Sequence, residues 1–327
     1  MAQDTNIVSA ENGADAYLRL FEHHDVEYFF NSPGSEDSAF WEAFAKREAD
    51  AAADSEITYI NCRHEAVAVG MAKGYTMLTG NPQVVKLHVN TGTLHGAMEL
   101  YGVNHSSIPM LVLSSYIDTH EGELVGGTEG AHYLDFQQPG GHENNIARYV
   151  KWLTNIKTNK NAERVLSRGF RITASPPQGP VFVNVSEELL QDPTKNSATL
   201  VKNPPATPRV PDSSVLDNIV ERLETAENPL IITGRTGEHP ETVDHLVDLA
   251  EMLEIPVFEN QKWHYNFPMD HPLYVGASSG TGVSPQPLFE KGVDLVLVVD
   301  STKPWYPPEN GAPNDADIIW LESEPAQ

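Results

Sequence analysis

The chain has 327 residues, of which 46 are Asp or Glu and 21 are Lys or Arg, so its formal net charge is −25 at pH 7. A surface this negative repels phosphate backbones and anionic lipids, which argues against nucleic acid and membranes as partners. The single cysteine, Cys62, excludes an intramolecular disulfide framework and a four-cysteine zinc site. The length suggests two domains of ~150 residues each.

The first twenty residues carry neither the basic n-region nor the apolar h-region of a signal peptide. Apolar runs such as 110–113 and 295–299 fall far short of the ~20 residues that a membrane-spanning helix needs. The lone cysteine agrees with a reducing compartment. These features predict a cytoplasmic protein.

Short apolar runs alternate with helix-length segments along the first half of the chain. Strands are predicted at 26–30, 57–61, 84–88, 110–114 and 181–185, and helices at 36–45, at 64–79 and from about residue 94. Continuous apolar strands that alternate with helices are typical of a parallel sheet covered on both faces. We therefore expect an α/β domain over residues 1–192.

A break in composition follows at 193–213, where prolines are frequent and apolar residues few, as in a linker between domains. The alternation then resumes. Helices are predicted at 214–225, 240–253 and near 288, and strands at 230–233, 255–258, 295–299 and 318–321. The predicted fold is therefore α/β, with two doubly wound parallel-sheet domains, the second a smaller Rossmann-like unit over 214–327.

The turn after the first predicted strand contains Pro33, Gly34 and Ser35, followed by two acidic residues. Pro-Gly supplies a tight turn, and a serine here can cap the next helix. This structural role is sufficient by itself. It does not exclude a ligand contact by Ser35, because strand ends border clefts.

Two more polar residues stand where a predicted strand gives way to a helix. Glu65 has the position of a first-turn glutamate that complements the helix dipole, or of a buried carboxylate that exchanges a proton with a ligand. His88 ends a strand, where ligands of open α/β sheets sit and where an acid–base histidine is useful. The alternative for His88 is a hydrogen-bonded turn residue.

The succession strand–PGS–helix, strand–RHE–helix and strand–LHxxxGT–helix resembles the pyrimidine-binding domain of thiamine diphosphate enzymes of the acetolactate synthase and benzoylformate decarboxylase type. Residues 214–327 resemble the central domain of that family, through Pro229-Leu-Ile-Ile and Phe267-Pro-Met-Asp-His-Pro. The resemblance covers nearly the whole chain.

The resemblance implies roles for individual residues. The family's glutamate at the position of Glu65 hydrogen-bonds the aminopyrimidine of the cofactor and promotes formation of a C2 carbanion that adds to a carbonyl. Ser35 and His88 match a catalytic serine and histidine of benzoylformate decarboxylase, and His271 matches its second histidine, although Asp-His-Pro also has a structural use. The implied cofactor-binding residues are Glu65, Pro33, Gly34, Thr91, Gly92, Thr93 and His95. At His95, benzoylformate decarboxylase has an asparagine.

The family's diphosphate-binding motif, Gly-Asp-Gly with a downstream Asn, does not occur in these 327 residues. We therefore expect thiamine diphosphate to be bound together with Mg²⁺ whose ligands lie on a second subunit, because a hard cation needs that oxygen set. The chain itself is expected to dimerise through its pyrimidine-binding domains. A truncated gene or fragment is the alternative to a natural split.

The predicted activity is decarboxylation or carboligation of 2-oxo acids or aldehydes, like that of benzoylformate decarboxylase. An acetolactate synthase-like carboligase, a C–C lyase or hydrolase, and a non-catalytic regulatory subunit remain as alternatives. The turn Gly234-Arg235-Thr236-Gly237 follows a strand and is a weak candidate for a phosphate contact, but it is not a GxGxxG motif. The sequence predicts no FAD.

Overall fold

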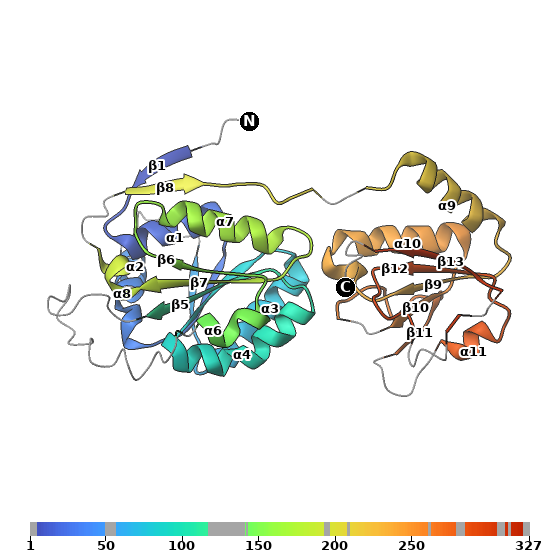
Figure 1. Ribbon diagram of the computed structural model, residues 1–327, viewed down its shortest axis with the longest axis horizontal. Coiled ribbons are helices and arrows are strands. Elements are labelled where there is room, and N and C mark those ends of the chain that lie inside the picture. Colours follow the sequence, from blue (N-terminus) through green and yellow to red (C-terminus); the bar gives the residue numbers. More distant parts are fainter. Residues whose placement is uncertain are drawn as a thin grey trace. The chain divides into compact units, whose positions relative to one another are not determined.

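The computed structural model describes residues 5–49, 57–116, 141, 143–192, 197–207, 210–260, 263–278, 285–305, 311–312 and 315–322. The chain divides into two compact units, Met1–Ala206 and Thr207–Gln327. Each unit is a parallel sheet flanked by helices (Figure 1), which confirms the predicted fold class. None of the described helices combines the length and the apolar content of a membrane-spanning segment.

The first unit is built on six parallel strands in the order β3-β2-β4-β5-β7-β6. Their bounds are β2 (Tyr28–Ser32), β3 (Thr58–Asn61), β4 (Gln83–Leu87), β5 (Met110–Tyr116), β6 (Trp152–Ile156) and β7 (Pro180–Ser186). Strands β4 and β7 are buried along their whole length. This explains why their apolar residues stand in unbroken stretches, 84–85 and 181–183, rather than alternating with polar ones.

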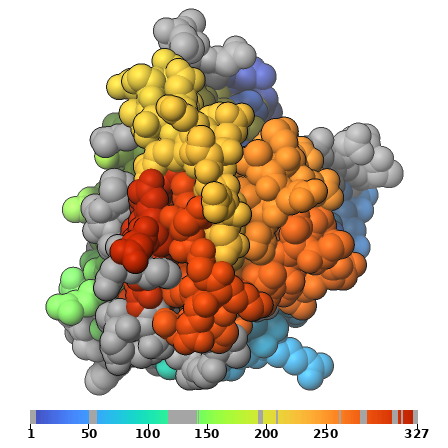
Figure 2. Space-filling view, turned by 90° about the vertical axis from the view of Figure 1, so that its right-hand side faces the viewer, coloured from blue at the N-terminus to red at the C-terminus, as the bar shows by residue number. Residues whose placement is uncertain are grey.

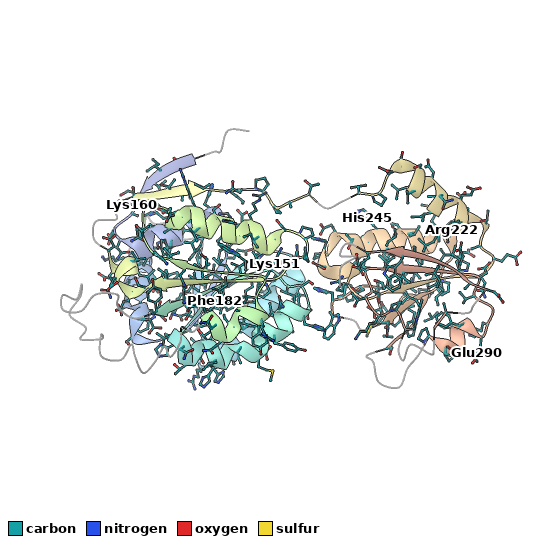
Figure 3. All side chains as sticks on the ribbon, in the orientation of Figure 1. Lys151, Lys160, Phe182, Arg222, His245 and Glu290 are labelled. Atoms are coloured by element: carbon teal, nitrogen blue, oxygen red, sulfur yellow. The ribbon has the colours of Figure 1, made fainter. Side chains whose placement is uncertain are left out.

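Helices cover both faces of this sheet. One face carries α1 (Gly13–His23), α2 (Ser38–Ala49), α7 (Ala162–Ala174) and α8 (Glu187–Gln191); the other carries α3 (Glu65–Thr79), α4 (Val89–His105) and α6 (Glu143–Ile146). Successive residues of one strand serve opposite faces: Val181 and Val183 belong to the first apolar cluster, and Phe182, labelled in Figure 3, belongs to the second. The period of two along a strand therefore produces two separate cores.

A two-stranded antiparallel sheet adds to the first unit. Strand β8 (Ser197–Val201) pairs with β1 (Thr5–Ser9), with Ala198 opposite Val8. Ala198 and Val201 are buried, and Ala198 joins the core under α1 and α7. The segment 193–213, expected to be a linker, thus contains a strand, in which Ala198 and Leu200, two positions apart, both contact this core.

The second unit has five parallel strands in the order β11-β10-β9-β12-β13. They are β9 (Pro229–Thr233), β10 (Val257–Asn260), β11 (Tyr274–Ser278), β12 (Leu295–Val299) and β13 (Asp317–Leu321). Helices α9 (Ser213–Thr225) and α10 (Glu241–Leu253) pack on one face, and the single turn α11 (Gln286–Phe289) on the other. Figure 2 looks onto this unit, with α9 in yellow and α10 in orange. Arg222 of α9, labelled in Figure 3, forms an ion pair with Asp317 of β13.

Helix α4 begins at Val89 rather than near residue 94. His88 is its N-cap, with extended backbone dihedral angles of φ −64° and ψ 130°, and the amide of Thr93 donates to the carbonyl of His88 at 3.2 Å. Thr91, Gly92 and Thr93 therefore form the first turns of the helix and not a separate turn. A glycine inside a helix costs about 1 kcal/mol relative to alanine, so its presence here needs a packing reason.

Candidate active site at the switch point of the first sheet

The three motifs singled out in the sequence lie at the carboxyl ends of three neighbouring strands. Asn31 of β2 is opposite Asn61 of β3, and Ser32 of β2 is opposite Leu87 of β4. The chain moves from β2 outward to β3 and then back across β2 to β4, so the strand order reverses between β2 and β4. Open α/β sheets bind ligands at such a point.

Two glycines allow these strand ends to approach closely. A Cβ atom on Gly34 would lie 1.9 Å from Nδ1 of His88, and one on Gly92 would lie 2.7 Å from Oε1 of Glu65 and 2.9 Å from Cβ of His88. Neither glycine has a positive φ. At both positions a larger residue is excluded by the lack of space and not by the backbone conformation. Gly92 lies in contact with both Glu65 and His88.

Glu65 is the first residue of α3 and is buried, with 8% of its surface exposed. The preceding His64 caps the helix, and its Nδ1 accepts a hydrogen bond from the amide of Ala66 at 3.1 Å. The positive end of the helix dipole favours a carboxylate at this place. Glu65 thus combines burial with a fixed position at the start of a helix.

His95 of α4 approaches Glu65, with 3.3 Å between its Nδ1 and Oε2 of the carboxylate. The His95 ring also stacks on His64, with centroids 5.0 Å apart and planes 10° from parallel. The ligand atoms of His64, Glu65 and His95 lie within 4.8 Å of one another. A metal ion would need to lie in both ring planes at once, next to the positive end of α3, so the arrangement suits hydrogen bonding better than metal coordination.

His88 is held by Glu36, the residue that follows the PGS turn. Nδ1 of His88 lies 2.8 Å from both carboxylate oxygens of Glu36, whose side chain is 1% exposed. Glu36 belongs to the 3-10 helix η1 (Ser35–Asp37) and also accepts a hydrogen bond from the amide of Val89 at 3.2 Å. One buried carboxylate thus fixes both the His88 ring and the start of α4.

Beneath this pair lies Lys86, the only lysine of the described residues that is fully buried. Its ammonium nitrogen lies 2.5 Å from Oδ1 of Asp37 and 3.6 Å from Oε1 of Glu36, and it donates to the carbonyl of Leu87 at 3.1 Å. Asp37 also accepts hydrogen bonds from Nδ2 of Asn31 and from the amide of Gly34, both at 3.2 Å. Two carboxylates, one ammonium group and one imidazole thus form a single network.

The charges of this network shift one another's pKa values. The hydrogen bond with Glu36 raises the pKa of His88, against an opposing effect of burial. Burial alone would raise the pKa of Glu36, but Lys86 and His88 outweigh it and lower that pKa to about 2. Burial raises the pKa of Asp37, and the neighbouring Glu36 carboxylate adds to this effect. Glu36 is therefore ionised at neutral pH, where it favours the protonated imidazole.

The other residues proposed for this site differ in their surroundings. Ser35 is exposed and begins η1, so the N-cap expected at Ser35 is instead Gly34. Thr91 is exposed on the first turn of α4, and Pro33 is half-buried. Thr93 is fully buried, and its hydroxyl donates to the carbonyl of Val89 at 2.7 Å and lies 3.0 Å from Oγ of Ser114. Thr93 therefore ties α4 to β5 inside the unit.

His271 belongs to the second unit, where both of its ring nitrogens have partners. Nε2 lies 3.1 Å from Oε1 of Glu251, and Nδ1 accepts from the amide of Leu273 at 3.2 Å. The ring packs edge-on against Phe267 at 5.0 Å. These contacts hold the His271 ring within its own unit.

The turn at 234–237, a weak candidate for a phosphate contact, is also engaged by its own unit. The amide of Gly237 donates to Oδ1 of Asn266 at 3.0 Å, and the guanidinium of Arg235 donates to Oε1 of Glu322 at 2.7 Å. A Cβ atom on Gly237 would lie 1.8 Å from the carbonyl oxygen of Tyr265. The turn is thus packed against a loop, and these two donors already have partners within the unit.

Sequence reasoning missed Glu36 and Lys86 as site residues. The available signal was Lys86 itself, a lysine in the middle of the apolar strand Val84–Leu87. Lysine is almost never fully buried unless it is paired. A buried strand with a lysine therefore indicates acidic partners from a neighbouring element, and the adjacent acidic pair after Ser35 supplies them.

Two family models match most of this chain. The thiamine pyrophosphate enzyme N-terminal TPP binding domain matches residues 11–142, and the central domain of thiamine pyrophosphate enzymes matches residues 216–327. Benzoylformate decarboxylase of Pseudomonas aeruginosa is 23% identical over 317 residues, which are 95% of this chain and 56% of that protein. Acetolactate synthase of Bacillus subtilis is 23% identical over 316 residues, covering 95% of this chain and 51% of that protein.

A solved structure, the thiamine diphosphate-dependent 4-hydroxybenzoylformate decarboxylase of Rhodococcus jostii, matches with a TM-score of 0.72 at 22% identity. The match covers 95% of this chain and 56% of that one. At this identity, the match shows a shared fold. The chain spans about half the length of the curated relatives that it matches.

Proposed function

The chain belongs to the thiamine pyrophosphate enzyme family, and from this premise we propose that it is the pyrimidine-binding subunit of a split thiamine diphosphate-dependent enzyme acting on 2-oxo acids or aldehydes. When bound, thiamine diphosphate supplies a nucleophilic carbon that attacks the carbonyl of such a substrate. The observation that carries the proposal is the contact of Gly92 with both Glu65 and His88 at the switch point of the sheet.

The proposed contacts with the cofactor and with the substrate lie on opposite sides of Gly92. Glu65, buried at the start of α3, holds a proton at a nitrogen of the aminopyrimidine ring, and His95 supports its carboxylate. His88 exchanges a proton with the substrate or binds its carboxylate, and Ser35 and Thr91 are the exposed hydroxyls at the same strand ends. Gly34 and Gly92 keep these groups close together.

The Mg²⁺ and diphosphate are proposed to be held outside these 327 residues, on a second polypeptide with a Gly-Asp-Gly motif. Mg²⁺ prefers carboxylate, carbonyl and water oxygens in octahedral geometry. Among the described residues, the group of His, Cys, Asp and Glu that converges closely enough to hold an ion is His64, Glu65 and His95, two of which are nitrogen donors. This donor set does not suit Mg²⁺.

An exposed apolar face next to Glu65 supports a partner. Helices α3 and α4 expose six large apolar residues, namely Val67, Met71, Leu78, Leu94, Met98 and Tyr101. Cβ atoms on Gly70 and Gly74 of α3 would meet no atom within 4 Å. Large apolar side chains gathered on two neighbouring helices are typical of a protein interface. We propose that the diphosphate-binding domain of the second subunit covers this face, which completes the site between chains.

The proposal is tested by co-expression with a candidate partner that carries Gly-Asp-Gly and a downstream Asn. We expect the pair to copurify and to decarboxylate a 2-oxo acid only with added thiamine diphosphate, while this chain alone is inactive. Turnover by this chain alone would contradict the split. Acetolactate formed from pyruvate would assign the carboligase alternative instead of simple decarboxylation. A dimer of this chain alone, held by Met98 and its neighbours, would assign the apolar face to self-association.

The variant Glu65→Gln keeps the size of the side chain and removes its acid–base function. We expect it to lower turnover of the complex by about 10²-fold or more, and the matched variant Glu99→Gln on α4 to leave it unchanged. Equal turnover of Glu65→Gln and the unaltered complex would indicate the regulatory alternative, a subunit that retains the fold without catalysis.

A further inference from the structure

Glu36 follows β2 and His88 follows β4, and the two side chains meet where these neighbouring strands end. The carboxylate is almost fully buried, whereas the imidazole side chain is 30% exposed. Nδ1 of His88 lies on the Glu36 carboxylate, and Nε2 has no hydrogen-bond partner among the described residues. The ring therefore has one fixed nitrogen and one available nitrogen.

The charged groups around His88 come from three elements. Glu36 and Asp37 approach from η1 and Lys86 from β4, and Glu65 of α3 lies on the other side of Gly92. Within the buried network, the single ammonium group of Lys86 faces two carboxylates, so one negative charge is uncompensated whenever Asp37 is ionised. Burying an uncompensated charge is costly. A proton on His88 neutralises the network, so the network itself favours the imidazolium.

We propose that Glu36, balanced by Lys86, is the positioning residue for His88: it holds Nδ1–H of the imidazolium, so that Nε2–H binds an anionic group of the substrate. Glu36 is too deeply buried to contact the substrate and acts through His88. That this anion is the carboxylate of a 2-oxo acid rests on the proposed function. The pairing of Glu36 with His88 does not depend on it.

Lys86 explains why this arrangement is stable. Without it, Glu36 and Asp37 would be two adjacent buried carboxylates, and one would take up a proton. With it, Glu36 stays ionised and can accept from His88 and from the amide of Val89 at the same time. The hydrogen bonds of Asp37 to Asn31 and Gly34 then fix the PGS turn against the same lysine.

The first test is a histidine titration of the full chain by NMR, with His88→Gln used to assign the His88 signals. We expect the midpoint of His88 to lie above 6.5, and Glu36→Gln to lower it by about one unit or more. Glu251→Gln is the matched control, because it removes the partner of His271 in the second unit and should leave the His88 midpoint unchanged. Equal midpoints in Glu36→Gln and the unaltered chain would overturn the pairing.

The second measurement needs no substitution at Glu36 and so is independent of the stability of that variant. Above its midpoint, neutral His88 should carry its proton on Nδ1, because Nδ1–H donates to Glu36. The ¹⁵N shifts of the two ring nitrogens report this tautomer directly. A neutral form protonated on Nε2 would contradict the proposal.

The anion is tested in the unaltered chain with benzoylformate and its uncharged methyl ester. We expect the His88 signals to move with benzoylformate and not with the ester; movement with both, or with neither, would overturn anion binding at Nε2. In the reconstituted complex, Glu36→Gln should raise KM for the 2-oxo acid more than kcat falls. A complex that shows the His88 titration but no thiamine diphosphate-dependent turnover would refute the proposed function and leave the pairing intact.

Discussion

Gly92 of α4 lies directly against Glu65 of α3, so that a Cβ atom on the glycine would be 2.7 Å from Oε1 of the carboxylate. The same atom would be 2.9 Å from Cβ of His88. One small residue therefore sets the distance between the two side chains that the sequence placed at separate strand ends. Any side chain at position 92 must displace one of them.

Gly92→Ala should displace Glu65 or His88 and destabilise the first unit by about 1–3 kcal/mol, because the added methyl group has no free volume. Thiamine diphosphate-dependent turnover of the complex should fall with it. Gly70→Ala is the matched control in α3, since its Cβ would meet no atom within 4 Å. It should stabilise the isolated chain by up to about 1 kcal/mol through helix propensity. Urea unfolding checks both values, and equal effects of the two variants would refute the tight contact.

Lys86→Met tests the buried network. Removal of the ammonium group leaves Glu36 and Asp37 without their counter-charge, so the free energy of unfolding should fall by about 3–5 kcal/mol. Lys46→Met is the control, because Lys46 pairs with Glu11 and Glu42 at the surface, with half of its side chain exposed. Exposed pairs contribute about 0–1 kcal/mol. Similar unfolding midpoints for the two variants would show that Lys86 is not paired as described.

His24 predicts an acid-sensitive stability of the first unit. The ring lies between α1 and β8, 4.3 Å from Phe170, and its Nε2 bonds to the carbonyl of Val201 at 3.0 Å. Burial lowers the pKa of His24 to about 4. In the unfolded chain, His24 has its usual pKa of about 6.5. Between pH 6.5 and 4, His24 is therefore protonated in the unfolded state and neutral in the folded state. Stability from this group is complete above pH 6.5 and is lost as the pH falls toward 4.

The shift from 6.5 to about 4 corresponds to about 3 kcal/mol. His24→Gln should therefore flatten the decline of the unfolding free energy between pH 7 and pH 4, whereas His105→Gln, at an exposed position of α4, should keep the original slope. Urea unfolding at several pH values provides the measurement. A parallel decline in all three proteins would exclude His24 as the cause.

The opposite sign holds for His88, whose pKa is raised by Glu36. Its contribution to stability is complete below about pH 6.5 and is lost as the pH rises through the elevated value. The two histidines thus oppose each other near neutrality. The double variant His24→Gln with Glu36→Gln should remove both dependences, which separates them in one series.

Met98 tests the apolar face of α3 and α4. Its surface is 76% exposed, so Met98→Asp should leave the isolated chain folded and should abolish copurification with the partner, because a charge would be buried at the interface without a counter-charge. Met252→Asp is matched, with 77% exposed on α10 of the second unit. It should copurify normally. Loss of copurification in both variants, or in neither, would show that the partner does not bind at the apolar face of α3 and α4.

Local patterns in the sequence predicted most of the elements that carry the site. Residues 65–79 form α3 with His64 as its cap and Gly80 in the left-handed conformation at its end, close to the expected 64–79. The strands that end at Asn61 and Leu87 also lie near their predicted bounds. These elements were readable because apolar periodicity and terminal residues are local signals.

The register of the whole sheet was not local and could not be read in this way. Strand β8 is formed by a proline-rich stretch that is paired with β1 from the other end of the unit, so its partner is far away in sequence. The start of α4 was placed too late because Gly92 reads as a turn residue, whereas in the fold it is a contact with Glu65. A glycine usually indicates a turn, but Gly92 lies within a helix because the close packing against Glu65 leaves no room for a side chain.

Short stretches of adjacent residues were enough to predict the α/β class and the family, and to place Glu65, His88 and Ser35 next to strand ends. The association of Glu36 and Lys86 with His88 emerged only from the three-dimensional fold. Their contact depends on β2 and β4 being neighbours in the sheet, with Ser32 opposite Leu87. A buried charge must find its partner across strands, and only the strand order determines which residue that is.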